Sequence, residues 1–291
     1  MKIIFLGTGS SALYPSMWCN CEYCKYAREN GGRNIRLSSS IHFAENCLID
    51  FPADIFNKAW QYKIDLLPTE LLLCTHSHED HFNSHLLKWR HKPYNTEIIK
   101  GEEIYNAGGA RFTDLPLLSI YGNRKIFKKL EPILGNGEMA DFAMDFCIPD
   151  AYREYHCNNV DFIPMIATHT DADGERGLIY IVHVQNKSFL YAVDSSTYID
   201  RTRDCIKAHK VDAVIMEATQ GTRDIGNGHM NFDRVKDETA FFCDNNIFTG
   251  QPRVILTHIS PHRCPPYDWL IELLKGTCME SAWDGMVMDL E

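Results

Sequence analysis

The sequence predicts a mixed fold of strands and helices, α/β or α+β, with two β-sheets packed face to face and helices outside them. Three observations predict it: short β-rich runs recur along the chain, helix-period patterns lie between them, and the composition is that of an ordinary globular protein. Hydrophobic residues make up 45% and charged residues 23% of the 291 residues. This composition excludes a disordered, collagen-like or coiled-coil chain. Because no repeat or Pro/Gly-rich linker divides the sequence, we expect one domain over residues 1–291.

The expected elements follow from hydrophobic periodicity. The strands are short apolar runs, most of which end at a small or polar residue: Lys2–Gly7, Ser40–Phe43, Cys47–Phe51, Glu70–Thr75, Leu117–Tyr121, Val160–Ala167, Leu178–Val184, Ser188–Val193, Ala213–Glu217 and Arg253–Thr257. The helices are longer segments with apolar residues three and four apart: Ala53–Tyr62, Ser84–Trp89, Arg124–Leu134, Arg201–His209, Phe232–Asn245 and Tyr267–Leu274. Periodicity alone does not choose the topology.

The charge balance argues against nucleic acid and the membrane as partners. Acidic residues number 39 and basic residues 29, so the net charge is −10 with histidine neutral, and such a chain binds polyanions poorly. The stretch 91–160 holds 10 acidic and 8 basic residues, so it carries no basic arm. The apolar run within the first ten residues is too short for a signal sequence or a membrane span. We expect a cytoplasmic protein.

The 11 cysteines do not indicate a disulfide framework, because their number is odd and a cytoplasmic chain of this size does not need one. Cys19, Cys21 and Cys24 stand together as C-x-C-x-x-C, a spacing that is moderately specific for a metal site. Redox cysteines and free thiols are the competing interpretations. Most of the remaining, scattered cysteines are expected to be small buried apolar residues.

The sharpest motif follows the apolar run at Leu71. There the sequence LLLCTHSHEDHF places His76, His78, Asp80 and His81 in one short loop. Imidazole and carboxylate are ligands of zinc, manganese and iron, and alternating side chains of such a loop can serve two ions. Glu79, between these residues, is either a carboxylate behind the ligands or an exposed loop residue.

Three further residues each follow an apolar run and would complete two ion sites. His169 follows VDFIPMIAT, Asp194 follows KSFLYAV and His258 follows RVILT. Any one of them alone is weak, since a single histidine at a strand end is more often structural, but the three together form a pattern. Asp194 is the natural bridging carboxylate. His229 stands in a Gly-rich turn, and two interpretations of it have equal weight. It is either a residue that contacts substrate or supplies a proton, or an exposed loop histidine.

With these residues in place, the sequence resembles the metallo-β-lactamase-fold hydrolases. The shared elements are LGTG at Leu6–Gly9, LID at Leu48–Asp50, and T-H-x-H-x-D-H at Thr75–His81. The resemblance spans most of the chain and implies an α+β (αββα) fold with two mixed sheets between helices. It also implies that His76, His78 and His169 bind one ion, that Asp80, His81 and His258 bind a second, and that Asp194 bridges them.

Within that superfamily the sequence is most similar to the phosphoribosyl 1,2-cyclic phosphate phosphodiesterases, the carbon–phosphorus lyase accessory proteins. The similarity lies in RVILTHIS, in Asp268–Leu270, in Trp283–Met286 and in the cysteine motif. It implies a structural zinc bound by Cys19, Cys21, Cys24 and a fourth residue. The subfamily's histidine would stand at position 261, which is proline here, so either His262 or Cys264 is the fourth ligand, and His262 is favoured.

The resemblance implies a metal-dependent phosphodiesterase that hydrolyses a small cyclic phosphodiester such as phosphoribosyl 1,2-cyclic phosphate, with Asp80 and His229 as catalytic residues. The cofactors would be two divalent ions, manganese or zinc, and one structural zinc. The partner would be a small-molecule phosphodiester, with no nucleic acid and no membrane, and subfamily members suggest a homodimer. The alternatives are a hydrolase of another small ester, a cofactor-biosynthesis protein, a transfer-RNA 3′-processing nuclease and a non-catalytic metal-binding protein.

Overall fold

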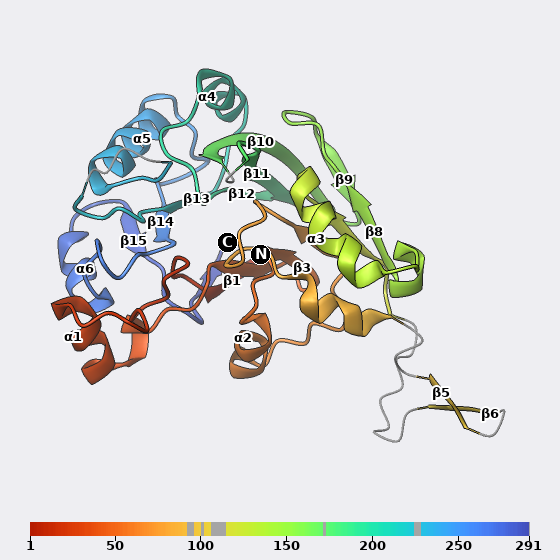
Figure 1. The fold of residues 1–291 in the computed structure, drawn as a ribbon. Coiled ribbons are helices and arrows are strands. Elements are labelled where there is room, and N and C mark those ends of the chain that lie inside the picture. Colours follow the sequence, from red (N-terminus) through yellow and green to blue (C-terminus); the bar gives the residue numbers. More distant parts are fainter. Residues whose placement is uncertain (92–95, 100–101, 106–114, 171–172, 224–227, 291) are drawn as a thin grey trace.

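Two seven-stranded sheets form the body of the protein (Figure 1). The computed structural model describes residues 1–91, 96–99, 102–105, 115–170, 173–223 and 228–290. The first sheet has the order β16-β1-β2-β3-β4-β7-β8. Its strands are β1 (Lys2–Gly7), β2 (Ser40–Phe43), β3 (Cys47–Ile49), β4 (Leu71–Leu73), β7 (Leu118–Tyr121), β8 (Met144–Cys147) and β16 (Val287–Asp289).

The second sheet has the order β15-β14-β13-β12-β11-β10-β9. Its strands are β9 (Tyr155–Cys157), β10 (Val160–Thr170), β11 (Arg176–Val184), β12 (Lys187–Ala192), β13 (Ala213–Glu217), β14 (Val254–Thr257) and β15 (Met279–Ser281). Strands β12 to β15 pair in parallel, as do β3, β4, β7 and β8 of the first sheet. Both sheets are therefore mixed. A separate two-stranded pair is formed by β5 (Thr96–Ile99) and β6 (Glu102–Tyr105).

In the described ranges six α-helices accompany the sheets: α1 (Glu22–Asn30), α2 (Ile55–Tyr62), α3 (Arg124–Leu134), α4 (Asp200–Lys207), α5 (Phe232–Asp244) and α6 (Tyr267–Leu273). Short 3₁₀ helices are η1 (Gly32–Asn34), η2 (Ser84–Arg90) and η4 (Met139–Phe142). Asparagine side chains cap α3 and α5: Asn123 accepts a hydrogen bond from the Ile126 N–H, and Asn231 accepts one from the Arg234 N–H. Each cap satisfies an N–H that the first turn leaves without a helical partner.

The core consists of three apolar layers, which show how the sheets and helices pack. In β11, Tyr180 and Val182 belong to the layer between the two sheets, whereas Ile179 and Ile181 belong to the layer under α4, α5 and α6. Successive strand residues point to opposite faces, so a continuous apolar run covers both faces of a buried sheet. The third layer packs α2 and α3 on the outer face of the first sheet. The arrangement is helix, sheet, sheet, helix.

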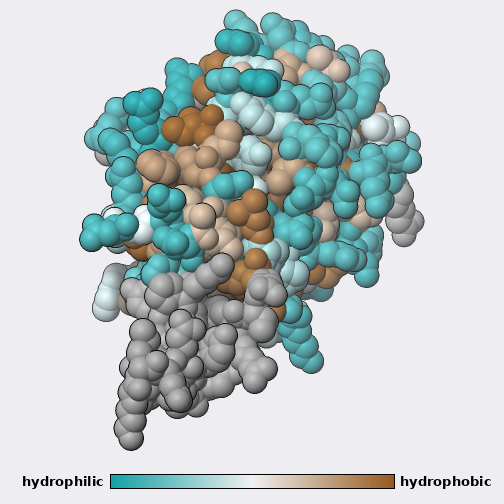
Figure 2. Space-filling model, turned by 90° about the vertical axis from the view of Figure 1, so that its right-hand side faces the viewer, coloured by the Kyte–Doolittle hydropathy of each residue, from teal (hydrophilic) through white to brown (hydrophobic). Residues whose placement is uncertain are grey.

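An apolar hollow of about 200 Å³ lies beside η2 on the side of the first sheet. Its lining includes Leu66, Leu67, Leu86, Trp89 and Leu118. The space-filling view of that side shows apolar side chains gathered on the surface (Figure 2). Within the described ranges, no helix has the length and the apolar character needed to cross a membrane.

The predicted strands and helices are present, with ends that move by a few residues. One expected helix differs in kind, because residues 84–90 form a 3₁₀ helix instead of an α-helix. The sequence reasoning missed α1, which begins inside the cysteine motif, and the short strands β5, β6, β8, β9, β15 and β16. Strands of three or four residues carry too few alternations to stand out from loops.

Candidate metal centre

The ends of strands from both sheets deliver the histidine and aspartate side chains to one edge of the sandwich. The loop from Cys74 to His81 follows β4, Asp194 follows β12 and His258 follows β14. His169 lies near the end of β10, within the stretch from Ile166 to Thr170 where the pairing with β11 shifts register. Carboxyl ends of parallel strands meet at one edge, and an irregularity of this kind redirects side chains. We call the seven residues that meet here the His/Asp cluster: His76, His78, Asp80, His81, His169, Asp194 and His258.

Four donor atoms form the first group within this cluster. His76 Nε2 lies 2.9 Å from His78 Nδ1, and His169 Nε2 lies 3.3 Å from the same atom. Asp194 Oδ2 lies 3.2 Å from His76 Nε2 and 3.8 Å from His169 Nε2. All four atoms lie within 4.8 Å of one another, which is the spacing of ligands around one ion.

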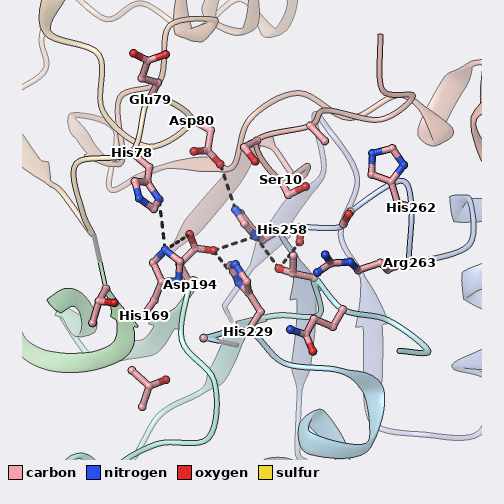
Figure 3. Close-up of a pocket in the computed structure, with 18 residues that line it drawn as sticks. Ser10, His78, Glu79, Asp80, His169, Asp194, His229, His258, His262 and Arg263 are labelled. Atoms are coloured by element: carbon pink, nitrogen blue, oxygen red, sulfur yellow. Dashed lines mark hydrogen bonds and ion pairs between the residues drawn. The ribbon is translucent and has the colours of Figure 1, made fainter. Parts of the chain in front are cut away.

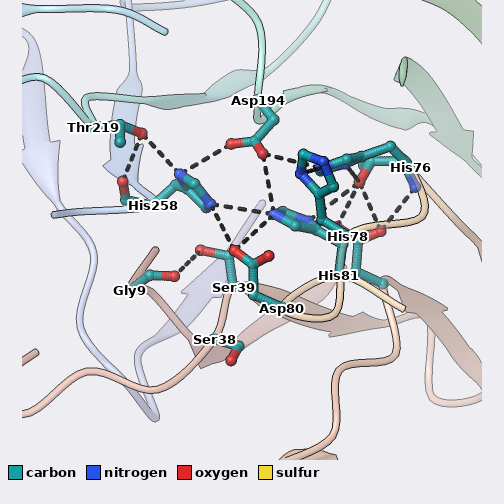
Figure 4. Close-up of polar contacts among 12 residues, drawn as sticks. Gly9, Ser38, Ser39, His76, His78, Asp80, His81, Asp194, Thr219 and His258 are labelled. Atoms are coloured by element: carbon teal, nitrogen blue, oxygen red, sulfur yellow. Dashed lines mark hydrogen bonds and ion pairs between the residues drawn. The ribbon is translucent and has the colours of Figure 1, made fainter. Parts of the chain in front are cut away.

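The second group lies beside the first. His81 Nε2 is 3.2 Å from His258 Nε2, and Asp80 Oδ2 is 3.5 Å from each of these two nitrogens. Asp194 Oδ2 lies 3.3 Å from His81 Nε2, so the same oxygen borders both groups (Figure 4). One carboxylate thus stands where a bridge between two ions would be needed.

Two buried groups behind the second group fix its imidazoles. Asp50 Oδ2 lies 2.7 Å from His81 Nδ1, and Asp50 Oδ1 accepts hydrogen bonds from Thr75 N and Thr75 Oγ1. Thr219 Oγ1 donates to the His258 carbonyl and lies 2.7 Å from His258 Nδ1. In both cases the partner faces Nδ1 and Nε2 is turned toward the cluster, which is the orientation a metal ligand needs.

Three residues of this edge have left-handed backbone conformations. The φ angles are 65° at Asp50, 51° at Asp194 and 55° at His258. Non-glycine residues adopt this region uncommonly, and aspartate and histidine do so more readily than most. Each of the three stands just after a strand, where the backbone turns sharply and aims the side chain inward. The sheets therefore hold these side chains in position.

The electrostatics of the cluster couple its carboxylates to its imidazoles. Burial by itself raises the pKa of Asp194, but the charges of His258 and His81 outweigh burial and hold this pKa well below its ordinary value. Burial lowers the pKa of His258, but Asp194 outweighs it and raises that pKa to about 10. For His169 burial dominates and lowers the pKa to about 4. Without an ion, imidazolium protons balance the carboxylates, and an ion would replace them.

The residues present fit a pair of divalent cations. Asp194 Oδ1 is buried and accepts no hydrogen bond, although it has an ion-pair contact with His258 Nδ1 at 3.0 Å. A buried carboxylate oxygen without a hydrogen-bond donor is costly unless another partner satisfies it. The donors are nitrogen and oxygen, which suit zinc, manganese and iron alike.

His229 lies beside the His/Asp cluster. Its Nδ1 is 3.0 Å from Glu217 Oε2 and 3.7 Å from Asp194 Oδ1. Burial lowers the pKa of His229, but the fully buried Glu217 carboxylate outweighs burial and raises this pKa above its ordinary value. The structure therefore places His229 at the site, and it is not an exposed loop histidine.

The cysteine cluster, by which we mean Cys19, Cys21, Cys24 and His262, lies on neighbouring loops. The donor atoms of Cys19, Cys21 and His262 lie within 4.8 Å of one another, and Cys24 is outside that group. Cys24 is buried in the first turn of α1, where burial, with smaller contributions from the thiols of Cys19 and Cys21, raises its pKa to about 12. Its role as a ligand stays a prediction.

Cys264 is turned away from this cluster. Its Sγ is buried and lies 2.9 Å from the Ala218 carbonyl oxygen. The arrangement thus favours His262 over Cys264 as the fourth donor.

A cavity of about 1050 Å³ opens over the His/Asp cluster. Its walls include His78, Glu79 and Asp80 on one side and His262 and Arg263 on the other, with Asp194 and His229 side by side between them (Figure 3). Glu79 is exposed at the rim. The metal-binding edge is therefore open to a ligand of moderate size.

Sequence reasoning gave no role to three buried residues of the site: Asp50, Glu217 and Thr219. Asp50 and Glu217 each close an apolar strand, which is the signal that identified Asp194 and His258. Thr219 lies two residues beyond its strand and gives no comparable signal. All three act on neighbouring imidazoles, and contacts of this kind become visible only in the folded chain.

No family model and no curated protein sequence matches the chain. Solved structures do match it. A diphosphatase from the PhnP family is 18% identical, with a TM-score of 0.69 over 99% of this chain and 97% of that one. Zinc-bound PqqB from Methylobacterium extorquens is 16% identical, with a TM-score of 0.69 over 100% of both chains. The metallo-β-lactamase fold protein YhfI from Bacillus subtilis is 13% identical, with a TM-score of 0.65 over 99% and 98%. Likeness at this identity shows the fold, which confirms the predicted one.

Proposed function

We propose that this chain, which has the metallo-β-lactamase fold, is a metal-dependent hydrolase of a small phosphodiester. The observation that carries the proposal is the pair of donor groups that share Asp194 Oδ2 at the floor of an open cavity, with His229 beside them. Structural metal sites are closed by four protein ligands, whereas a shared set of seven leaves positions for water and substrate. This arrangement supports catalysis over a purely structural role for the ions.

In the proposed enzyme His76, His78 and His169 would hold one ion and Asp80, His81 and His258 the other. Asp194, whose Oδ2 borders both groups, would be available to both. When bound, two divalent ions supply hydroxide near neutral pH and offset the charge that develops on phosphoryl oxygens. Asp50 and Thr219 keep the Nε2 atoms of His81 and His258 directed at the cluster. Asp80, between His81 and His258, would take part in catalysis through the ion that it would help to hold.

His229 supplies the acid. Glu217 accepts the Nδ1 proton, so Nε2 is the atom available to the cavity. A protonated Nε2 either donates its proton to the departing alkoxide or stabilises a non-bridging phosphoryl oxygen. The raised pKa of His229 favours the imidazolium form.

The proposed substrate is a small cyclic phosphodiester such as phosphoribosyl 1,2-cyclic phosphate. Two ester oxygens held in one small ring need no long groove, and the cavity of about 1050 Å³ is of the size used by small ligands. This chain shares its fold with the diphosphatase of the PhnP family, whose name describes a reaction at phosphate groups. The net charge of −10 and the balanced charges of residues 91–160, which include most of the undescribed positions, argue against a transfer-RNA nuclease.

Zinc is the proposed ion of the cysteine cluster, bound by Cys19, Cys21, Cys24 and His262. Thiolate and imidazole are the donors of structural zinc, and such a site would join the loop before α1 to the loop that carries His258. Cytoplasmic location and a homodimer remain predictions.

The test combines metal analysis with turnover. We expect about three ions per purified chain, one of them zinc, and hydrolysis of bis-p-nitrophenyl phosphate and of phosphoribosyl 1,2-cyclic phosphate with manganese added. A chelator should abolish turnover, and manganese should restore it. Full metal loading without hydrolysis of either diester, or cleavage of a transfer-RNA precursor alone, would contradict the proposal.

A further inference from the structure

One cationic side chain faces a cavity whose other charged residues are acidic or metal-binding. Among the described residues that line it, Arg263 is the sole lysine or arginine, whereas Glu79, Asp80 and Asp194 contribute carboxylates. Figure 3 places Arg263 across the cavity from His78 and Glu79, on the side of His262. The cavity is therefore polar along its length, with a carboxylate at one end and a guanidinium at the other.

The backbone around Arg263 is fixed from two sides. Its N–H donates to the Ser260 carbonyl at 3.4 Å, and its carbonyl accepts a hydrogen bond from the Thr222 N–H at 3.3 Å. Gly221 permits the close approach of the two loops, because a Cβ there would lie 2.4 Å from the Arg263 carbonyl oxygen and 2.6 Å from Cys264 Sγ. Gly221 also has φ +50°, a region that favours glycine. The loop after β13 thus holds Arg263 in place.

The guanidinium itself is unsatisfied. Arg263 is half-buried, and within the described part of the chain its side chain has no hydrogen-bond or ion-pair partner. Other half-buried arginines of this protein are paired: Arg203 binds Glu238 and Arg253 binds Glu280. A half-buried guanidinium with five donors and no acceptor suits an anion that the protein itself does not provide.

We propose that Arg263 is a specificity-determining residue that binds a second anionic group of the substrate, a phosphate that is not the one hydrolysed. This inference rests on the proposed function, which puts the scissile ester at the His/Asp cluster. The planar guanidinium can donate two parallel N–H···O bonds to such a phosphate. The carboxylate of Glu79 at the far end repels the same group, so the two ends orient the substrate in one direction.

The test compares ribose 1,2-cyclic phosphate with and without a 5-phosphate, using the metal-loaded wild type, Arg263→Met and Arg263→Lys. For the substrate with the 5-phosphate, Arg263→Met should raise KM and lower kcat/KM by about 10- to 100-fold, the range for loss of a charge-assisted bidentate contact. For the substrate without it, kcat/KM should not change. Arg263→Lys, which keeps the charge without the fork, should recover part of the loss.

The matched control is Arg253→Met, because Arg253 stands before β14 at the opposite end of the strand that precedes Arg263. That variant should keep the wild-type preference between the two substrates. An equal loss for both substrates in Arg263→Met, or a wild type with no preference for the 5-phosphate, would overturn the inference.

A binding measurement separates this inference from the proposed function. Calorimetry with ribose 5-phosphate should show weaker binding to Arg263→Met than to wild type by a similar factor. If the wild type hydrolyses neither diester but Arg263→Met still loses this binding, the proposed function fails and the anion site stands. If binding is unchanged, the anion site fails whatever the activity.

Discussion

The His/Asp cluster and the cysteine cluster share the loop after β14, yet the fold holds them in different ways. The donors of the first come from strand ends of both sheets and are mostly buried, and Asp50 and Thr219 fix two of its imidazoles from behind. The donors of the second come from a loop, the start of α1 and the half-exposed segment at His262. The sheets preorganise the first cluster, whereas the proposed zinc would hold the second together.

The largest effect should come from the residue that the two halves of the His/Asp cluster share. Asp194→Asn should lower kcat at least about 1000-fold, because the substitution removes the negative charge between both ions. The fold should survive, since asparagine tolerates the φ of 51° at this position. Circular dichroism and steady-state kinetics measure the two results.

The control for that variant is Asp212→Asn. Asp212 stands before β13, at the end of the strand that is opposite to the His/Asp cluster, so this variant should keep a kcat near that of the wild type. Loss of folding in Asp194→Asn would instead show that the cluster is structural, and the contrast with the cysteine cluster would disappear.

A smaller loss should follow from His229, which lies beside the His/Asp cluster without belonging to the proposed ligand set. His229→Ala should lower kcat by about 100-fold with the metal content unchanged, because only the acid is removed. Glu217→Gln should act through His229: without the carboxylate the pKa of the imidazole falls. Since the protonated form is the active one, the fall of kcat at alkaline pH should begin at lower pH in this variant. Loss of metal in either variant would place His229 among the ligands.

His156→Ala is the matched control for His229→Ala. His156 is an exposed histidine on the edge strand β9 that contacts Asp161 at 2.6 Å. We expect its kcat and pH profile to equal those of the wild type.

The preorganisation of the second donor group can be tested at Asp50. Asp50→Asn leaves His81 Nδ1 without its carboxylate partner and should weaken one of the two active-site ions by about 10- to 100-fold. Competition with a chelator measures the affinity of each ion. If the affinities for both ions fall equally, or neither falls, the contact of Asp50 with His81 does not distinguish the two donor groups.

The smallest effect on turnover is expected at the cysteine cluster. Cys19→Ser should remove one zinc per chain and lower the melting temperature by several degrees, while kcat falls less than about tenfold. Metal analysis and thermal unfolding check this, with Cys243→Ser on the exposed face of α5 as the control. A loss of activity as large as that of Asp194→Asn would mean that the two clusters are not separable.

The sequence predicted the fold and the principal donors because both leave local signals. Long apolar runs marked strands such as β11 and β14, and the dense loop at His76–His81 marked the cluster. What stayed hidden depends on contacts between distant segments. Glu217 and His229 stand 12 residues apart and meet only after β13 and the turn before α5 are in place. α1 was hidden because three cysteines and a weak apolar pattern indicated a loop.

The left-handed residues at the catalytic edge also limit how this protein can change. Asp50, Asp194 and His258 each need a side chain that tolerates φ near 50° to 65°, and asparagine and glycine tolerate it best. In a library that randomises these positions, a residue would have to meet two requirements. It must first adopt the left-handed backbone conformation, and it must then bind an ion. A β-branched residue would not meet the first requirement even where its size fits. The backbone of this edge therefore narrows the set of sequences from which new metal chemistries could be selected.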